Sequence, residues 1–229
     1  MMDAPSSVRP VLVLDDHPLV RTVLVLGLRA QGVDAVQLPI TGYDEILAAA
    51  GRYRPSLALL DLDLGDGIEG PPPNGLVLIG PLRSLGWSVL IVTASKNRGA
   101  IAAAVAQGAI GWVSKAEPFD RLLAVVLDAA EGREVLSGAA REELLRLDRE
   151  LRAHDVELNQ RLARLSSRER QVLDRLAAGR SAAGVAAEFK VSLATVRAQI
   201  RSIHAKLDVR SQLGAVAIVN EAKRAGRTI

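Results

Sequence analysis

The sequence predicts an α/β region with a parallel β-sheet, joined by one long helix to a smaller all-α region. Short apolar runs alternate with segments of helical periodicity through residues 10–132, and this alternation is typical of a parallel sheet with helices on both faces. Beyond residue 138 the short apolar runs cease and the helical spacing of leucines takes over. These observations predict two regions of different structural class in one chain.

The predicted strands are almost wholly apolar, as expected for strands buried on both faces of a sheet. Apolar runs mark four clear strands and one weaker candidate: 11–14, 57–60, 89–92, 110–113 and, more weakly, Val33–Leu38. Segments of helical periodicity lie between them, at 18–30, 42–50, 75–85, 97–106 and 119–132. The stretch 62–74 carries three glycines and three consecutive prolines, which favours a long loop.

One long helix is predicted over 138–165, where no proline or glycine follows Gly138. Its leucine spacing slips in phase, so two interpretations stay open: a solvated helix that packs only on its own domain, or a short coiled coil between two protomers. Four short helices are predicted after it, at 166–178, 182–189, 193–207 and 211–224. Ser166 and Glu169 form a capping-box pattern at the start of the first.

The composition limits the classes of protein that this chain can be. Its 229 residues suffice for one large domain or two modest ones, and it has no cysteine for disulfides or thiolate metal sites. It shows neither an apolar run of the roughly 18 residues that span a membrane nor a signal-peptide pattern, so we expect a cytoplasmic protein with no membrane partner. Residues 1–138 carry a net charge of −4 and residues 139–229 a net charge of +7. This asymmetry indicates an acidic site in the N-terminal part of the chain and a surface that binds a polyanion in the C-terminal part.

Polar residues follow the predicted strands at the points where the strands end: Asp15, Asp16, Asp61, Thr93 and Lys115. The carboxyl ends of parallel strands share one edge of a sheet, and open α/β sheets bind their ligands there. Three carboxylates brought together repel each other unless a cation lies among them, so this edge predicts a site for a hard divalent ion and an anion. An aspartate after a strand is also ordinary turn material; the recurrence on successive strand ends is what indicates a function.

The residue types at this edge suit phosphoryl transfer. An ionised Asp61 can attack phosphorus and form an acyl phosphate. A divalent cation held by the aspartates would offset the added negative charge. Lys115 would pair with one phosphoryl oxygen, and Thr93 would donate its hydroxyl to another.

The same residues lie in segments that resemble a response-regulator receiver domain over residues 10–132. The resemblance rests on VLVLDDHPLVR (11–21), LALLDLDL (57–64), VLIVTAS (89–95) and GAIGWVSKAEPFDRLLAVV (108–126). It implies a flavodoxin-like (βα)5 domain with sheet order 2-1-3-4-5, and transfer of a phosphoryl group from a histidine kinase to Asp61. It also implies Mg²⁺ at Asp15, Asp16, Asp61 and the backbone of Asp63.

The resemblance implies which residues respond to phosphorylation, and the chain also departs from the family pattern at several positions. Thr93 takes the place of the switch hydroxyl, and Trp112 that of the switch aromatic residue, which is more often Tyr or Phe. Several extra residues separate Asp61 from Gly75, the glycine expected to open the next helix. Three acidic residues of that loop would tune the bound ion, hinder the phosphodonor or be merely solvated: Asp63, Asp66 and Glu69. The step after Lys115 resembles a KxxxP-like subfamily, and we expect His17 to serve only the start of a helix.

The pattern of the basic C-terminal part of the chain, residues 166–229, predicts a helix-turn-helix. Within 193–207, an apolar stripe at spacings of four, three and four would face the core: Val196, Ile200, Ile203 and Leu207. The opposite face carries Arg197 and Arg201 among alanines 194, 198 and 205. Small residues with two arginines one turn apart suit close entry into a major groove, where arginine reads guanine. A solvated face on an ordinary helical bundle is the alternative explanation.

Residues 162–222 resemble the LuxR-type (NarL/FixJ) DNA-binding domain. The matching segments are LSSRERQVLDRLAAGRS (165–181), VAAEFKVSLATVRAQIRSIHAKLDV (185–209) and RSQLGAVAIV (210–219). The resemblance implies that the third helix enters the major groove of a double-stranded operator, with contacts from Lys190, Ser192, Thr195, Arg197, Ala198, Arg201, Lys206 and Arg210. It implies a homodimer contact on the fourth helix, through Leu213, Val216, Ala217 and Val219. The tripeptide 182–184 and Gln199 depart from the family pattern.

We therefore expect a transcriptional response regulator with a receiver domain at 8–133, a helical linker at 134–164 and a DNA-binding domain at 165–225. It would be phosphorylated on Asp61 and would not be an enzyme beyond weak self-dephosphorylation. One alternative is a constitutive dimer that binds DNA without phosphorylation. A remote alternative is a haloacid-dehalogenase-like phosphatase, because Asp61 and Asp63 form a DxD pattern.

Overall fold

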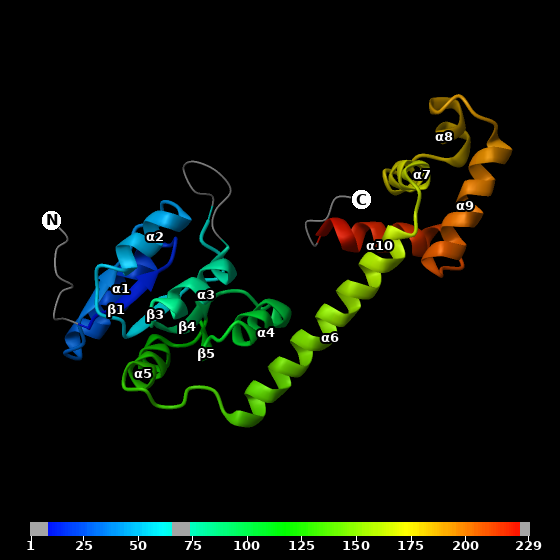
Figure 1. Cartoon of the computed structure of the whole chain (residues 1–229). Helices are drawn as coiled ribbons and strands as arrows, with labels where there is room; N and C mark the ends of the chain where they lie inside the picture. Colours follow the sequence, from blue (N-terminus) through cyan, green and yellow to red (C-terminus); the bar gives the residue numbers. More distant parts are fainter. Residues whose placement is uncertain (1–8, 66–73, 225–229) are drawn as a thin grey trace. The chain divides into compact units, whose positions relative to one another are not determined.

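The computed structural model describes residues 9–65 and 74–224. The chain divides into two compact units, Met1–Arg149 and Glu150–Ile229, here called the N-terminal and C-terminal units (Figure 1). Asp66 and Glu69 of the predicted acidic loop lie outside the described residues. In the part of the chain that is described, no helix has the length and apolar character needed to cross a membrane.

The N-terminal unit contains a five-stranded parallel sheet, which confirms the predicted fold class. The strands are β1 (Val11–Leu14), β2 (Ala35–Gln37), β3 (Leu57–Leu60), β4 (Ser88–Thr93) and β5 (Gly111–Ser114). Their order in the sheet is β2-β1-β3-β4-β5 and every pairing is parallel, as the resemblance implied. The weak strand candidate is the shortest strand of the five.

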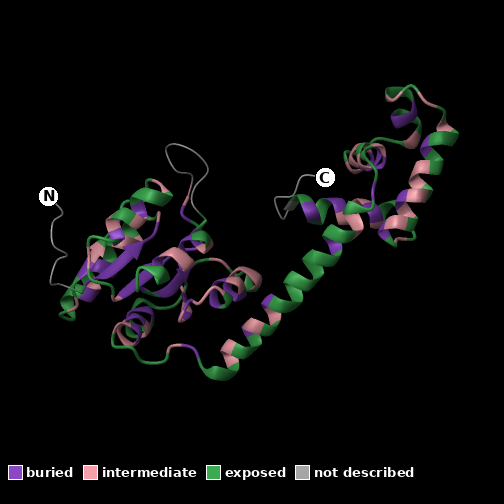
Figure 2. Ribbon diagram, in the orientation of Figure 1, coloured by how far each residue is buried: buried purple, intermediate pink, exposed green. Residues whose placement is uncertain are grey.

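Five helices cover the two faces of this sheet. They are α1 (Pro18–Ala30), α2 (Tyr43–Ala50), α3 (Gly75–Ser84), α4 (Arg98–Ala106) and α5 (Phe119–Ala130). Alternate residues of β1 point into different clusters: Leu12 packs with α2, α3 and α4, whereas Val13 packs with α1 and α5. The continuous apolar strands are therefore explained by burial on both faces (Figure 2).

The start of α3 determines where the loop after β3 ends. Asn74 caps the helix by accepting a hydrogen bond from Leu76 N at 3.0 Å. Gly75 follows at the first helical position, as predicted. A Cβ atom there would overlap the carbonyl oxygen of Asp61 and lie 2.9 Å from Leu62 Cα. Only glycine lets this helix approach the strand end that carries Asp61 so closely.

The long helix α6 (Gly138–Ala163) is continuous over 26 residues, as predicted from the leucine spacing. Leu144, in its first half, is 5% exposed within the N-terminal unit, and Leu158 is 4% exposed. These two leucines thus pack within the chain, while Leu151 between them is 43% exposed. A coiled coil between protomers stays a prediction.

The C-terminal unit consists of short helices around an apolar core: α7 (Ser167–Ala177), α8 (Ala182–Glu188), α9 (Leu193–Leu207) and α10 (Gln212–Arg224). The predicted capping box is present, because Ser166 Oγ accepts from Glu169 N and Glu169 Oε2 accepts from Ser166 N. Ser192 caps α9 by accepting a hydrogen bond from Thr195 N through its hydroxyl oxygen.

The structure corrects the expectation that Val219 contacts a second protomer. Val219 is fully buried in the core of the C-terminal unit, because α10 turns a stripe of Ala215, Val219 and Ala222 inward. A residue that is already packed inside one protomer offers no surface to a second. Leu213, by contrast, is 79% exposed.

Candidate functional site

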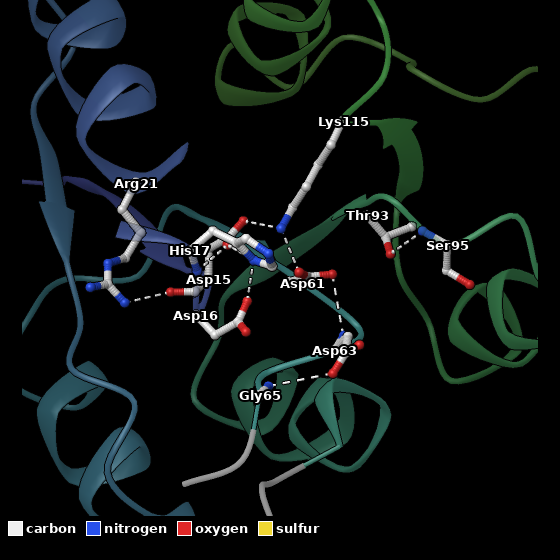
Figure 3. Close-up of polar contacts among 10 residues, drawn as sticks. All are labelled: Asp15, Asp16, His17, Arg21, Asp61, Asp63, Gly65, Thr93, Ser95 and Lys115. Atoms are coloured by element: carbon white, nitrogen blue, oxygen red, sulfur yellow. Dashed lines mark hydrogen bonds and ion pairs between the residues drawn. The ribbon is translucent and has the colours of Figure 1, made fainter. Parts of the chain in front are cut away.

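The predicted polar residues follow neighbouring strands at one edge of the sheet. Asp15 follows β1, Asp61 follows β3, Thr93 ends β4 and Lys115 follows β5. Asp61 N is tied to the main chain of β1 by a 2.9 Å hydrogen bond to Leu14 O. The backbone therefore fixes the aspartates after β1 and β3 side by side (Figure 3).

Lys115 joins two of the carboxylates. Its Nζ atom lies 2.5 Å from Asp61 Oδ2 and 2.6 Å from Asp15 Oδ2. Both aspartates are 2% exposed, and the lysine side chain is 9% exposed. Charges this deeply buried interact much more strongly than they would in water, so the ammonium holds the two carboxylates together.

Burial perturbs the protonation equilibria of this pair. Loss of solvation raises the pKa of Asp61, and the hydrogen bond and charge of Lys115 oppose that rise only in part. Burial alone would lower the pKa of Lys115, but its hydrogen bonds to Asp15 and Asp61 outweigh this and raise it. The lysine thus stays charged, while Asp61 is a more basic carboxylate than usual.

Asp16 and His17 complete the acidic edge. His17 Nδ1 lies 2.5 Å from Asp16 Oδ1 and 3.4 Å from Asp15 Oδ1, and its backbone N–H donates to Asp15 Oδ1 at 2.9 Å. Atoms of Asp15, Asp16, His17 and Asp61 that could bind a metal all lie within 4.8 Å of one another. The sequence interpretation assigned His17 only to the start of α1, although it directly follows the acidic pair.

The donor set fits a hard divalent cation. Carboxylate oxygens are the ligands that Mg²⁺ prefers, and this edge brings three carboxylates together with one lysine to balance them. Asp63 donates its backbone N–H to Asp61 Oδ1 at 3.2 Å. The role of its carbonyl group as a metal ligand stays a prediction. Gly65 lets the loop reach the site, because a Cβ atom there would lie 2.6 Å from Asp16 Oδ2.

The two predicted switch residues lie on β4 and β5, the two strands beyond β3 in the order of the sheet. Thr93 is 1% exposed, and its hydroxyl oxygen accepts a hydrogen bond from Ser95 N at 3.1 Å, away from Asp61 (Figure 3). Trp112 lies on β5 and is partly buried against the core. In this contact the Thr93 hydroxyl is the acceptor, so its own O–H group can still act as a donor.

Arg21 is a further residue of the site that the sequence interpretation missed. From α1, its Nη1 atom donates to the carbonyl oxygen of Asp15 at 2.6 Å. This bond holds the turn between β1 and α1, in which Asp15, Asp16 and His17 lie. Arg21 occurs in the segment quoted for the receiver resemblance, but neither spacing nor charge indicated its partner.

Most of the predicted DNA-contacting residues are exposed on the C-terminal unit. The apolar stripe of α9 is turned inward, with Val196, Ile203 and Leu207 buried. Seven of the eight predicted residues are exposed: Lys190, Ser192, Thr195, Arg197, Ala198, Arg201 and Arg210. Three alanines of α9 are exposed as well as these two arginines: Ala194, Ala198 and Ala205.

Lys206 differs from the other members of this set. Its Nζ atom lies 2.7 Å from Oε2 of the buried Glu169, and Ser202 Oγ donates to Glu169 Oε1 at 2.6 Å. Burial alone would raise the pKa of Glu169, but the hydrogen bonds from Lys206, Ser202 and the Ser166 backbone lower it to about 2. Lys206 therefore has a structural partner that competes with a DNA phosphate.

Comparison with known proteins agrees with both halves of this description. The family model for the response regulator receiver domain matches residues 11–127, and that for bacterial regulatory proteins of the luxR family matches residues 163–219. The probable transcriptional regulatory protein NarL of Mycobacterium tuberculosis is 32% identical over 93% of this chain and 94% of its own length. The nitrate/nitrite response regulator protein homolog of Haemophilus influenzae is 30% identical over 93% and 97%, respectively.

Among solved structures, the RcsB response regulator of Salmonella typhimurium is 19% identical, with a TM-score of 0.49 over 94% of this chain and 99% of that one. The two domain matches and the full-length relatives place the acidic edge in a receiver domain and the exposed arginines in a LuxR-type domain. The chain therefore belongs to the NarL/FixJ family of two-component response regulators, which regulate transcription through a LuxR-type DNA-binding domain.

Proposed function

We propose that Asp61 accepts a phosphoryl group from a histidine kinase and that this modification changes the affinity of the protein for operator DNA. The observation that carries the proposal is the contact between Lys115 and Asp61, 2.5 Å long and buried beside Asp15 and Asp16. A nucleophile, a cation and two further carboxylates meet at the sheet edge that binds ligands in open α/β sheets.

The chemistry follows from the atoms present. One carboxylate oxygen of Asp61 attacks the phosphorus of a phosphohistidine; the new O–P bond forms as the N–P bond breaks, and the electron pair returns to the imidazole nitrogen. Lys115 then pairs with a phosphoryl oxygen instead of Asp61 Oδ2. Asp15, Asp16, Asp61 and the Asp63 carbonyl would hold Mg²⁺, which offsets the charge of the transferred group.

We assign residues 8–133 to the receiver domain, 134–164 to a helical linker and 165–225 to the DNA-binding domain. On the last, Arg197 and Arg201 would read base edges, while Lys190, Ser192, Thr195 and Arg210 would contact phosphates. A dimer contact through Leu213, Val216 and Ala217 would place two α9 helices on the half-sites of one operator. A regulator of bacterial DNA acts in the cytoplasm.

Response regulators of this family are not classical enzymes, and we assign this chain at most a weak self-dephosphorylation. The DxD pattern of Asp61 and Asp63 follows the third strand of the chain. In the phosphatase family the motif follows the first strand instead. Steady hydrolysis of a small phosphate ester would contradict the assignment.

The test uses the full chain with acetyl phosphate and Mg²⁺. We expect the mass to rise by one phosphoryl group, the Asp61→Asn variant to stay unmodified, and a gel shift against genomic fragments to change with the phosphodonor. An unchanged mass would refute the proposal. Operator binding by Asp61→Asn that equals phosphorylated wild type would instead favour a phosphorylation-independent dimer.

A further inference from the structure

His17 precedes α1, but its side chain does not serve the helix. His17 is the N-cap residue, and within the described part of the chain its side chain makes no capping hydrogen bond. The imidazole lies instead beside the acidic pair, with Nδ1 2.5 Å from Asp16 Oδ1 and 3.4 Å from Asp15 Oδ1 (Figure 3). Because an N-cap side chain that stabilises a helix uses an oxygen atom, the position of this ring needs another explanation.

The backbone on both sides of His17 fixes the direction of the imidazole. Pro18 follows it, and a residue before proline is confined to extended conformations, in agreement with its φ of −81° and ψ of 106°. The backbone N–H of His17 donates to Asp15 Oδ1 at 2.9 Å, and Arg21 Nη1 donates to the Asp15 carbonyl oxygen at 2.6 Å. A ring on so constrained a turn loses little conformational freedom when it binds a ligand.

The acidic edge is buried on one side and open to solvent on the other. Asp15 and Asp61 are 2% exposed, whereas the side chains of Asp16 and His17 are 26% and 62% exposed. The Asp16 carboxylate and the His17 imidazole are therefore the donors that a cation entering from solvent reaches first.

Lys115 leaves oxygen atoms of the buried carboxylates available to a second cation. Its Nζ atom contacts Oδ2 of Asp15 and Oδ2 of Asp61, whereas the His17 ring lies near Oδ1 of Asp15. One donor atom from each of Asp15, Asp16, His17 and Asp61 lies within 4.8 Å of the others. Ligands at about 2.0–2.2 Å from one ion are at most about 4.4 Å apart, so small side-chain shifts would bring this set around a single cation.

The imidazole changes which cations this donor set favours. Carboxylate oxygens suit Mg²⁺ and Mn²⁺, whereas an imidazole nitrogen suits Zn²⁺, Ni²⁺, Cu²⁺ and iron. The chain has no cysteine to supply a softer ligand, and its other histidines, His154 and His204, belong to the C-terminal unit. His17 is therefore the imidazole that would select a transition ion at this edge.

We propose that His17 is a metal ligand and that, together with Asp15 and Asp16, it makes the acidic edge a site for a divalent transition ion such as Ni²⁺, Co²⁺ or Zn²⁺. The inference rests on the proposed function, because it concerns the cation site for which Mg²⁺ is proposed there. The imidazole adds affinity for the transition ion and little for Mg²⁺, so the two ions compete for one site. The cation beside Asp61 then depends on which divalent ions surround the protein.

The first experiment measures Ni²⁺ and Mg²⁺ binding to the full chain by isothermal titration calorimetry, without a histidine tag and without a phosphodonor. We expect wild type to bind one Ni²⁺ that Mg²⁺ displaces. His17→Gln should lower the ratio of Ni²⁺ to Mg²⁺ affinity at least about tenfold, since losing even an outer-sphere partner of a metal costs about 10–100-fold. His154→Gln is the matched control, because His154 is also exposed but lies in the C-terminal unit. It should leave the ratio unchanged.

A second experiment identifies the ligand directly. In the protein loaded with Co²⁺, a coordinated imidazole gives a ring N–H signal that is shifted far outside the normal range of the proton NMR spectrum. We expect such a signal in wild type and in His154→Gln, and its loss in His17→Gln. This measurement is made at saturating Co²⁺, so it does not depend on how tightly each variant binds the ion.

The outcomes separate the two proposals. Absence of Mg²⁺-dependent modification of Asp61 by acetyl phosphate would refute the function proposed for Asp61. Normal modification, with an affinity ratio equal in wild type and His17→Gln or a shifted signal that persists in His17→Gln, would overturn the role of His17 and leave the function of Asp61 intact. His17 would then form only an exposed contact with Asp16, of a kind that contributes little to stability. The metal measurements need no phosphodonor, so they test His17 in either case.

Discussion

The Lys115 ammonium lies 2.5 Å from Asp61 Oδ2 and so connects the ends of β5 and β3, two strands separated by β4 in the sheet. The same ammonium also contacts Asp15. One lysine thus serves two buried carboxylates, and the site keeps a surplus of negative charge that favours a bound cation.

Replacing Lys115 by methionine should lower the free energy of unfolding by about 3 kcal/mol, because removing one partner leaves buried charges without compensation. Mg²⁺ should recover part of this loss by taking over the neutralisation of Asp15 and Asp61. Urea unfolding with and without Mg²⁺ measures both effects. Lys96→Met, at an exposed position, is the control, and an equal loss in the two variants would contradict the expected role of Lys115.

Gly75→Ala should lower the free energy of unfolding by about 1–3 kcal/mol, since the added methyl group would collide with the backbone of Asp61 and Leu62. It should also weaken Mg²⁺ binding by shifting Asp61. Gly80→Ala lies in the same helix with open space around the site of its Cβ atom, and should stabilise by about 0.5–1 kcal/mol. Thermal unfolding and Mg²⁺ titration compare them; two variants that behave alike would show that the close approach is unimportant.

Much of this site could be predicted because it depends on strand ends. The apolar run before Asp61 is a strand buried on both faces, and parallel pairing then brings Asp15, Asp61 and Lys115 to one edge whatever the details of the loops. Helix caps at Ser166 and Ser192 were predictable because a cap is a local hydrogen bond between residues three apart in the sequence.

The residues that could not be predicted depend on contacts between distant segments. Lys206 was expected at DNA, but its ammonium donates to Oε2 of the buried Glu169, 37 positions earlier in the chain. Val219 was expected at a dimer contact, because the spacing in α10 does not reveal which apolar stripe is buried. The contacts of His17 depend on how the turn after β1 directs the imidazole, which the spacing of residues leaves open.

The ion pair of Glu169 should make stability depend on pH in acid. Its pKa is lowered from 4.5 to about 2 in the folded chain, so its contribution is fully present above about pH 4.5 and is lost as the pH falls through about 2. At neutral pH this amounts to at most about 3 kcal/mol. The wild type should therefore exceed Glu169→Gln in stability near neutral pH, by a margin that shrinks below pH 4.5.

Urea unfolding of both proteins between about pH 7 and pH 3 tests this. Asp208→Asn is a suitable control, since this exposed carboxylate caps α9 in the left-handed conformation, which asparagine also adopts readily. A constant difference between wild type and Glu169→Gln over the whole range would contradict the lowered pKa.

Arg201 and Lys206 should behave differently on DNA although both are basic residues of α9. Arg201→Ala removes an exposed guanidinium and should weaken operator binding by about 1–3 kcal/mol, with relaxed preference at one base pair. Lys206→Met should mainly destabilise the C-terminal unit, because it strips the buried Glu169 of its cation. Fluorescence anisotropy at several salt concentrations, alongside urea unfolding, distinguishes the two, since a lost phosphate contact reduces the salt dependence by about one ion. If Lys206→Met left stability intact and reduced the salt slope, Lys206 would be a phosphate contact and its pairing with Glu169 would be incidental.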